Sequence, residues 1–188
     1  MSNCEGLGSG GDNLLPPRPF ANYALDYHDL GLAIIPCEGK LPKVSWKKYQ
    51  TKAPSLATIY RWMKIFPAAN IGLITGRISG ITVIDCDDPN LSLEELEAEF
   101  GESKFVVSTP SGGRHLYYSF NGETSKTSYK QKIDVRGEGG LIIAPYSFNS
   151  CKETHYIITK GGLDNLTLLS GSAPYRLKRS VISVSDFV

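Results

Sequence analysis

The stretch Ile81-Thr82-Val83-Ile84-Asp85-Cys86-Asp87 is the most informative part of this sequence, because a β-branched apolar run leads directly into two acidic residues. Side chains alternate along a strand, so Asp85 and Asp87 would project from one face with Cα atoms about 6.6 Å apart, at roughly 3.3 Å per residue. Two carboxylates at the exit of a buried strand favour a hard divalent cation such as Mg²⁺ or Mn²⁺. The competing interpretation is a simple turn, since Asp87 and Asp88 directly precede Pro89.

A third carboxylate, Asp134, follows Ile133 in another short apolar segment. If its strand neighbours the strand of Asp85 and Asp87, the three carboxylates could hold two metal ions about 3.5–4 Å apart. Such a pair of ions stabilises the attacking and leaving oxygens in phosphoryl transfer. We therefore predict that Asp85, Asp87 and Asp134 are catalytic metal ligands.

The segment Ser111-Gly112-Gly113-Arg114-His115 is a second candidate for chemistry. A glycine-rich turn can present backbone N–H groups, and Ser111, Arg114 and His115 add donors for an anionic group such as a triphosphate. A single histidine is more often a hydrogen-bonded structural residue, but this one shares a domain with three isolated carboxylates. The segment is therefore predicted to bind a nucleotide, with His115 also catalytic.

Many short strands and only about three helices are expected around these residues, alternating unevenly along the chain. This pattern predicts an α+β domain with a mixed or antiparallel sheet, and argues against a doubly wound parallel sheet. Segments 105–109 and 116–120 should form a hairpin. Apolar, β-branched runs predict strands at 32–35, 71–74, 81–84, 105–109, 116–120, 133–136, 141–144 and 156–159.

Helices are predicted from apolar periodicity and capping residues. One should run from Phe20 to about Leu32. A second should begin after Ser55 and bury a stripe at Leu56, Ile59, Tyr60 and Met63. A third, acidic helix should open with the capping box of residues 92–95 and stop at Gly101. Residues 40–54 are polar, rich in lysine and bracketed by prolines, and are predicted to be a loop.

Charge is unevenly distributed in this chain of 188 residues, although its formal net charge is +1. Eight of the 19 acidic residues lie between positions 85 and 102, so 20 Lys and Arg outnumber the remaining acids. A cluster of basic side chains either binds a polyanion or is ordinary solvated surface. The basic groups are Lys40, Lys43, Lys47, Lys48 and Lys52, and Lys126, Lys130, Lys132 and Arg136.

Length and composition predict one globular domain with short tails. We expect a flexible leader at 1–19, a catalytic domain at 20–172 and a C-terminal tail at 173–188. No apolar run approaches the roughly 18 residues that span a bilayer, which predicts a soluble, intracellular (cytoplasmic) protein without a membrane partner. The four cysteines are 33 or more residues apart, which argues against a zinc site or a disulfide framework.

Six segments in order resemble the bifunctional DNA primase/polymerase (Prim-Pol) domain of the archaeo-eukaryotic primase superfamily, over roughly residues 21–160. The resemblance implies an RNA-recognition-like sheet that carries the catalytic residues, beside a smaller α/β unit. Each segment is weakly specific, but the order of all six is hard to obtain by chance. They are residues 31–36, 39–43 with Trp46, 70–76, 83–87, 109–118, and 133–140 with Ala144 and Pro145.

The resemblance also implies an activity and its partners. The chain would be a template-directed nucleotidyltransferase in a replication protein of a plasmid, phage or mobile element. It would use Mg²⁺ or Mn²⁺ to join an NTP or dNTP to a primer on single-stranded or primed DNA. Family members often act with a helicase, and an accessory helical domain is often needed to start primers. Neither fits in the roughly 28 residues after Lys160. Primer extension is therefore expected more than primer initiation.

Individual residues take roles from the same resemblance. Asp85, Asp87 and Asp134 match the family's metal ligands, and His115 would face the nucleotide phosphates. Additional nucleotide contacts are expected from Arg136 and Lys43, and template contacts from Lys40, Lys47 and Lys48. Two rival functions use the same residues: a metal-dependent nuclease, and a degenerate module that binds nucleic acid without catalysis.

Overall fold

The computed structural model describes residues 17–130 and 132–170; most of the predicted leader and the whole predicted tail lie outside them. Helices and strands alternate unevenly along the chain. In order they are α1 (Pro19–Asp29), β1 (Ile34–Glu38), β2 (Leu41–Pro42), the 3₁₀ turn η1 (Lys47–Gln50), α2 (Leu56–Ile65), β3 (Asn70–Ile74), β4 (Ile81–Cys86), α3 (Leu93–Phe100), β5 (Phe105–Ser108), β6 (Arg114–Ser119), β7 (Lys126–Lys130), β8 (Ile133–Arg136), β9 (Leu141–Ile143), β10 (Phe148–Asn149), β11 (Thr154–His155), β12 (Ile157–Gly161) and η2 (Leu163–Asn165).

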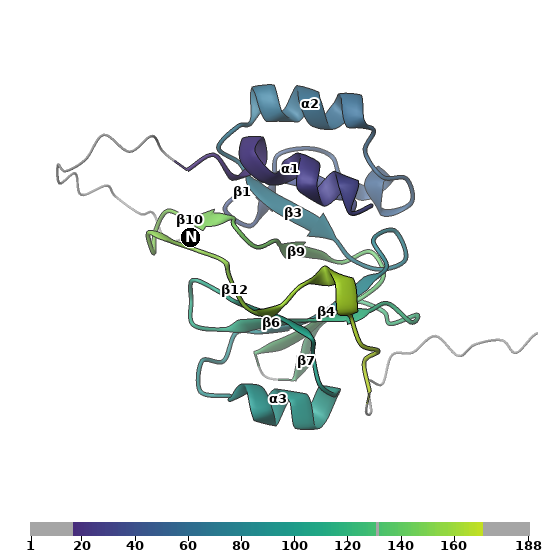
Figure 1. The fold of residues 1–188 in the computed structure, drawn as a ribbon, viewed down its shortest axis with the longest axis vertical. Helices are drawn as coiled ribbons and strands as arrows, with labels where there is room; N and C mark the ends of the chain where they lie inside the picture. Colours follow the sequence, from purple (N-terminus) through teal and green to yellow (C-terminus); the bar gives the residue numbers. More distant parts are fainter. Residues whose placement is uncertain (1–16, 131, 171–188) are drawn as a thin grey trace, which may run out of the picture.

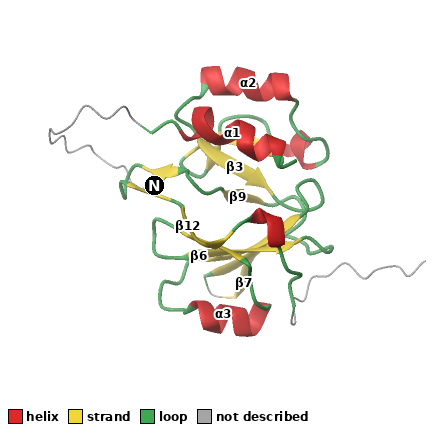
Figure 2. Ribbon diagram, viewed as in Figure 1, coloured by secondary structure: helices red, strands yellow, loops and turns green. Residues whose placement is uncertain are grey.

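Two antiparallel sheets form the centre of the molecule. The smaller has the strand order β2-β1-β3-β9, and the larger has the order β12-β5-β6-β4-β8-β7. Figure 1 shows α1 and α2 on the outer side of the smaller sheet and α3 on the outer side of the larger one. In Figure 2 the strands therefore lie in the middle, between two layers of helix. This arrangement confirms the predicted α+β class with antiparallel pairing.

Strand β4 shows how the layers divide the apolar residues. Val83 belongs to the core that α1, α2 and the smaller sheet share with the inner face of the larger sheet. Ile84 and Cys86 belong to a second core beneath α3. Because side chains alternate along a strand, Asp85 points to the same side as Val83. The acidic residue therefore lies on the face of the larger sheet that is turned toward the smaller sheet.

The predicted helix starts are confirmed. Ser55 precedes α2 and its Oγ accepts a hydrogen bond from the N–H of Thr58. Ser92 and Glu95 form the reciprocal capping box of α3, and Gly101 ends the helix with a φ of 88°. A positive φ of this kind is the conformation that glycine adopts most easily.

Several local predictions are wrong. In α2, Leu56 and Tyr60 are 43% and 47% exposed, because the face turned to the core is that of Ile59 and Trp62. The predicted loop at 40–54 contains β2 and η1. Cys151 is disulfide-bonded, contrary to the expectation from cysteine spacing.

The helices between residues 17 and 170 that the structure describes are too short or too polar to cross a membrane.

Candidate active site

Three of the predicted site residues form one row across the larger sheet. Asp85 on β4 lies directly opposite His115 on β6. On its other side, Asp85 lies directly opposite Asp134 on β8. Side chains of directly opposed residues in antiparallel strands share a face and lie about 5 Å apart at Cβ. The strand register therefore places Asp134, Asp85 and His115 side by side on the inner face.

Arg136 completes this row. It lies two residues after Asp134 on β8, so its side chain points to the same face of the sheet. Its Nη2 lies 2.6 Å from Asp134 Oδ2 and 3.5 Å from Asp85 Oδ2. The other oxygen of Asp134 accepts a hydrogen bond of 2.6 Å from the N–H of Ser128. Asp134 thus has a partner for each oxygen, whereas Asp85 is only partly satisfied.

Polar atoms without partners gather at Asp85. His115 Nε2 lies 3.3 Å from Asp85 Oδ1, within ion-pair distance but without hydrogen-bond geometry. In the described part of the chain, Asp85 Oδ1, His115 Nδ1 and Arg136 Nε are buried and have no hydrogen-bond partner. Buried polar atoms are normally paired, so three unpaired ones in one place call for a partner such as an ordered water, an ion or a ligand.

The charge of Asp85 is stabilised by its neighbours. Burial is the largest influence and raises the pKa of this carboxyl, but contact with His115 and the charges of His115, Arg136 and Lys40 together lower the pKa below its usual value. Asp85 is therefore an ionised carboxylate at neutral pH although only 5% of its surface is exposed. An ionised, buried carboxylate can hold a metal ion, provided that the ion displaces the Arg136 guanidinium now beside it.

Asp87 lies just beyond the end of β4 and is exposed. Its N–H donates a hydrogen bond of 2.8 Å to the carbonyl oxygen of Lys132, which continues the β4–β8 pairing by one residue. The strand alternation thus extends to Asp87, on the same side as Asp85. No three His, Cys, Asp or Glu side chains in the described residues are already arranged as a metal site.

The glycine turn holds His115 in place but offers few free donors. The N–H groups of Gly112 and Gly113 donate to the carbonyl and hydroxyl oxygens of Thr109 within the turn. Ser111 is exposed. Arg114 is directed to the other face, where its Nη1 donates a 2.6 Å hydrogen bond to the carbonyl oxygen of Leu91. The structure therefore does not bring Arg114 together with His115.

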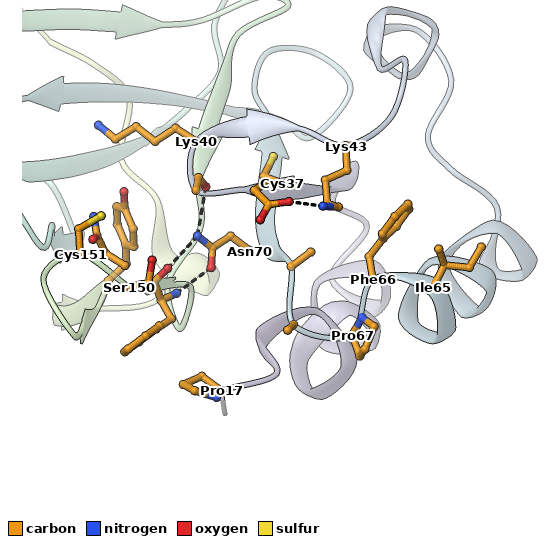
Figure 3. A pocket seen from close by; sticks show the side chains of 17 residues that line it. Pro17, Cys37, Lys40, Lys43, Ile65, Phe66, Pro67, Asn70, Ser150 and Cys151 are labelled. Carbon is orange, nitrogen blue, oxygen red and sulfur yellow. Dashed lines mark hydrogen bonds and ion pairs between the residues drawn. The ribbon is translucent and has the colours of Figure 1, made fainter. Parts of the chain in front are cut away.

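A cavity of about 760 Å³ lies beside the row, between the β1–β2 turn, the segment before β3, and the β10–β11 hairpin. Lys40 and Lys43 both line it, and Figure 3 shows them on separate parts of its wall. Lys43 pairs with Glu38 and lies over the ring of Phe66. Lys40 is close enough to Asp85 to affect its pKa.

Lys47 and Lys48 lie elsewhere, on η1. The side chain of Gln50 in this turn donates a hydrogen bond to the carbonyl oxygen of Gly139. Gly139 follows β8 in the chain. Because the end of β8 pairs with the start of β4, Gly139 lies away from Asp85. Both lysines are exposed but are separated from the carboxylate row.

Two tyrosines at the site were missed by sequence reasoning. Tyr117 is fully buried next to the row, and its hydroxyl has no hydrogen-bond partner within the residues described. Tyr156 lies with its ring centroid 5.6 Å from that of His115 and also lines the cavity. Tyr117 lies within the family-like segment 109–118 but carries no polar pattern that marks it as functional, and no local motif includes Tyr156.

The family model for the N-terminal domain of bifunctional DNA primase/polymerases, Prim-Pol, matches residues 24–169. The chain belongs to the Prim-Pol family. No curated protein matches the sequence. The Prim-Pol match covers β4, β6 and β8, the strands that carry the row. Family membership indicates primase/polymerase activity in DNA replication in general terms, with DNA and nucleotides as binding partners.

Proposed function

We propose that this Prim-Pol domain is a template-directed nucleotidyltransferase that adds an NTP or dNTP to a primer 3′-hydroxyl. The supporting observation is the row of Asp134, Asp85 and His115, flanked by Arg136, on one face of the larger sheet. It places negative oxygens that could hold cations next to positive donors that could bind phosphates. Phosphoryl transfer to a hydroxyl needs both.

The residues of the row fit divalent cations. Asp85 presents a buried oxygen without a hydrogen bond, and Asp87 adds an exposed carboxylate on the same side. Carboxylate oxygens are the ligands that Mg²⁺ and Mn²⁺ prefer. We propose Asp85 and Asp87 as metal ligands, joined by Asp134 when it releases Arg136. When bound, the ions would activate the 3′-hydroxyl and neutralise charge on the triphosphate.

The basic side chains would bind the nucleotide. His115 lies on β6 with its Nδ1 buried and without a hydrogen-bond partner, and this nitrogen would contact a phosphate oxygen once the site opens to the nucleotide. Arg136 would move its guanidinium from Asp134 to the leaving pyrophosphate, where positive charge stabilises the transition state. Lys43 at the cavity wall would contact the triphosphate. Arg114 does not enter this proposal, because it donates to Leu91 on the opposite face.

Template contacts are proposed for the remaining lysines. Lys40 lies near the carboxylates, so it would contact the template next to the reacting nucleotide. Lys47 and Lys48 on η1 would contact phosphates farther along the strand. Contacts of this kind are electrostatic and independent of sequence, so binding should weaken as salt concentration rises.

Primer extension tests the proposed function directly. The full chain is incubated with a labelled primer on a longer template, dNTPs or NTPs, and Mg²⁺ or Mn²⁺. We expect a ladder of extended primers with release of pyrophosphate. Shortened primers would instead indicate the metal-dependent nuclease, and metal-independent DNA binding without any new product would indicate the degenerate module.

His115→Ala should weaken nucleotide binding and leave the metal site intact. We expect the apparent KM for nucleotide to rise at least about tenfold, the loss of roughly 1.4 kcal/mol for one charge-assisted contact. Mn²⁺ affinity, measured by titration, should stay near that of the parent chain. The matched control is His155→Ala, since His155 is exposed, with its Nδ1 at the carbonyl oxygen of Tyr146 and its ring beside that of Phe148. A variant that chiefly loses Mn²⁺ binding would contradict this role.

A further inference from the structure

Asn70 begins β3, and its side chain joins two segments that are far apart in the chain. Its Nδ2 donates a hydrogen bond of 3.1 Å to the carbonyl oxygen of Gly39 and one of 2.9 Å to that of Phe148. Its Oδ1 accepts a hydrogen bond of 2.8 Å from the N–H of Phe148. Figure 3 draws these bonds as dashed lines at Asn70. A single side-chain amide therefore connects β3 to the β1–β2 turn and to the β10–β11 hairpin.

Asn70 is almost fully buried, with 6% of its surface exposed. Its contacts use both a donor nitrogen and an acceptor oxygen, and only an amide side chain offers the two together at this length. The N–H of the next residue, Ile71, donates a hydrogen bond of 3.1 Å to Ser147 Oγ. The start of β3 therefore holds the start of β10 at two successive residues. Loss of the amide would leave buried backbone groups without partners, which costs more than the bonds themselves contribute.

The bond to Gly39 fixes the turn that carries Lys40. Gly39 and Lys40 form the two-residue turn between β1 and β2, and Gly39 has a φ of 55°, which glycine adopts easily in such turns. The carbonyl group that Asn70 binds belongs to the peptide unit that joins Gly39 to Lys40. The side chain of Lys40 is exposed and lies near enough to Asp85 to affect its pKa. Fixing this peptide unit therefore fixes the direction in which the lysine leaves the turn.

We propose that Asn70 is a positioning residue of the candidate active site, which holds Lys40 where it contacts the template beside Asp85. The inference rests on the proposed function, which gives Lys40 its template contact. A lysine side chain loses conformational freedom when it is fixed on a partner. A backbone that is already held in place leaves less to be ordered when DNA binds. The role also gives a function to the family-like segment 70–76, none of whose residues belongs to the row.

DNA binding tests this role without requiring catalysis. The affinity of the full chain for a labelled single-stranded template is measured by fluorescence anisotropy at several salt concentrations, for the parent, Lys40→Met, Asn70→Ala and the double variant. Loss of one phosphate contact should flatten the log–log salt dependence by about 0.7. We expect this change for Lys40→Met and also for Asn70→Ala, which leaves every charge in place. The double variant should show the same slope as Lys40→Met alone, because Asn70 acts through the lysine.

Asn149→Ala serves as the matched control, because Asn149 lines the same cavity and its side chain accepts a hydrogen bond from the N–H of Lys152. Its salt dependence should equal that of the parent chain. Asn70→Asp is a second variant in case Asn70→Ala is too unstable to assay. It keeps the acceptor for the N–H of Phe148 but has no donor for Gly39, so it should flatten the slope as well. Asn149→Asp controls for its added charge, and urea unfolding of each variant shows that the fold is retained.

The outcomes separate the positioning role from the proposed function. An unchanged slope in the Asn70 variants, or a further loss of slope when Asn70→Ala is added to Lys40→Met, would overturn the positioning role. An unchanged slope in Lys40→Met would contradict the template contact of Lys40, and the inference with it. The expected slopes without any extended primer would contradict the proposed catalysis and leave the positioning role supported.

Discussion

Asp85→Asn should reduce primer extension at least about a thousandfold, equivalent to roughly 4 kcal/mol of lost transition-state stabilisation. Asp85 is the central residue of the row, in contact with both His115 and Arg136. The substitution keeps the shape of the side chain but removes the negative charge that would hold a cation. Extension is measured as kcat/KM at saturating Mg²⁺ or Mn²⁺, and circular dichroism should show an unchanged fold.

Asp87→Asn and Asp134→Asn are expected to fail in the same assay, because each would remove a ligand from the same pair of ions. The matched control is Asp164→Asn, an exposed carboxylate in η2 that should extend primers like the parent chain. Near-normal extension by Asp85→Asn at saturating metal would remove Asp85 from the catalytic site.

Gly113→Ala should damage both the stability and the activity of the domain. An added Cβ would lie 2.2 Å from the carbonyl oxygen of Cys86 and 3.2 Å from the Cα of Asp87. These are backbone atoms at the end of β4, so no flexible side chain can move aside. We expect the free energy of unfolding to fall by at least about 2 kcal/mol, as for other overpacked sites. Extension should also fall, since the turn before His115 and the backbone of Asp87 must separate.

Urea unfolding monitored by fluorescence measures the first effect. Gly162→Ala provides the control, because its added Cβ would meet only the end of the Asp164 side chain, at 3.0 Å, and that side chain can rotate. Its unfolding midpoint should lie close to that of the parent chain. An equal midpoint for Gly113→Ala would show that β4 and the turn are not tightly packed at this point.

Much of the local structure follows from short-range sequence patterns. Side-chain alternation along 81–87 places Asp85 and Asp87 on one side, and the capping residues Ser55 and Ser92 mark where α2 and α3 begin. Each of these signals depends on residues within a few positions of one another. Sequence alone was therefore sufficient for the α+β class, the β5–β6 hairpin and the main strands.

Tertiary structure decided which of these residues meet. Asp134 and His115 flank Asp85 only because β8 and β6 pair with β4 in a particular register, and a slip of one residue would turn the side chains to the other face. The same alternation turns Arg114 away toward Leu91. Lys40 and Lys47, seven positions apart, lie in different surroundings, near Asp85 and beside Gly139. Tyr156 reaches His115 because β12 and β6 both pair with β5 in the larger sheet. No local pattern encodes this contact, since it depends on strand order rather than on neighbours in the chain.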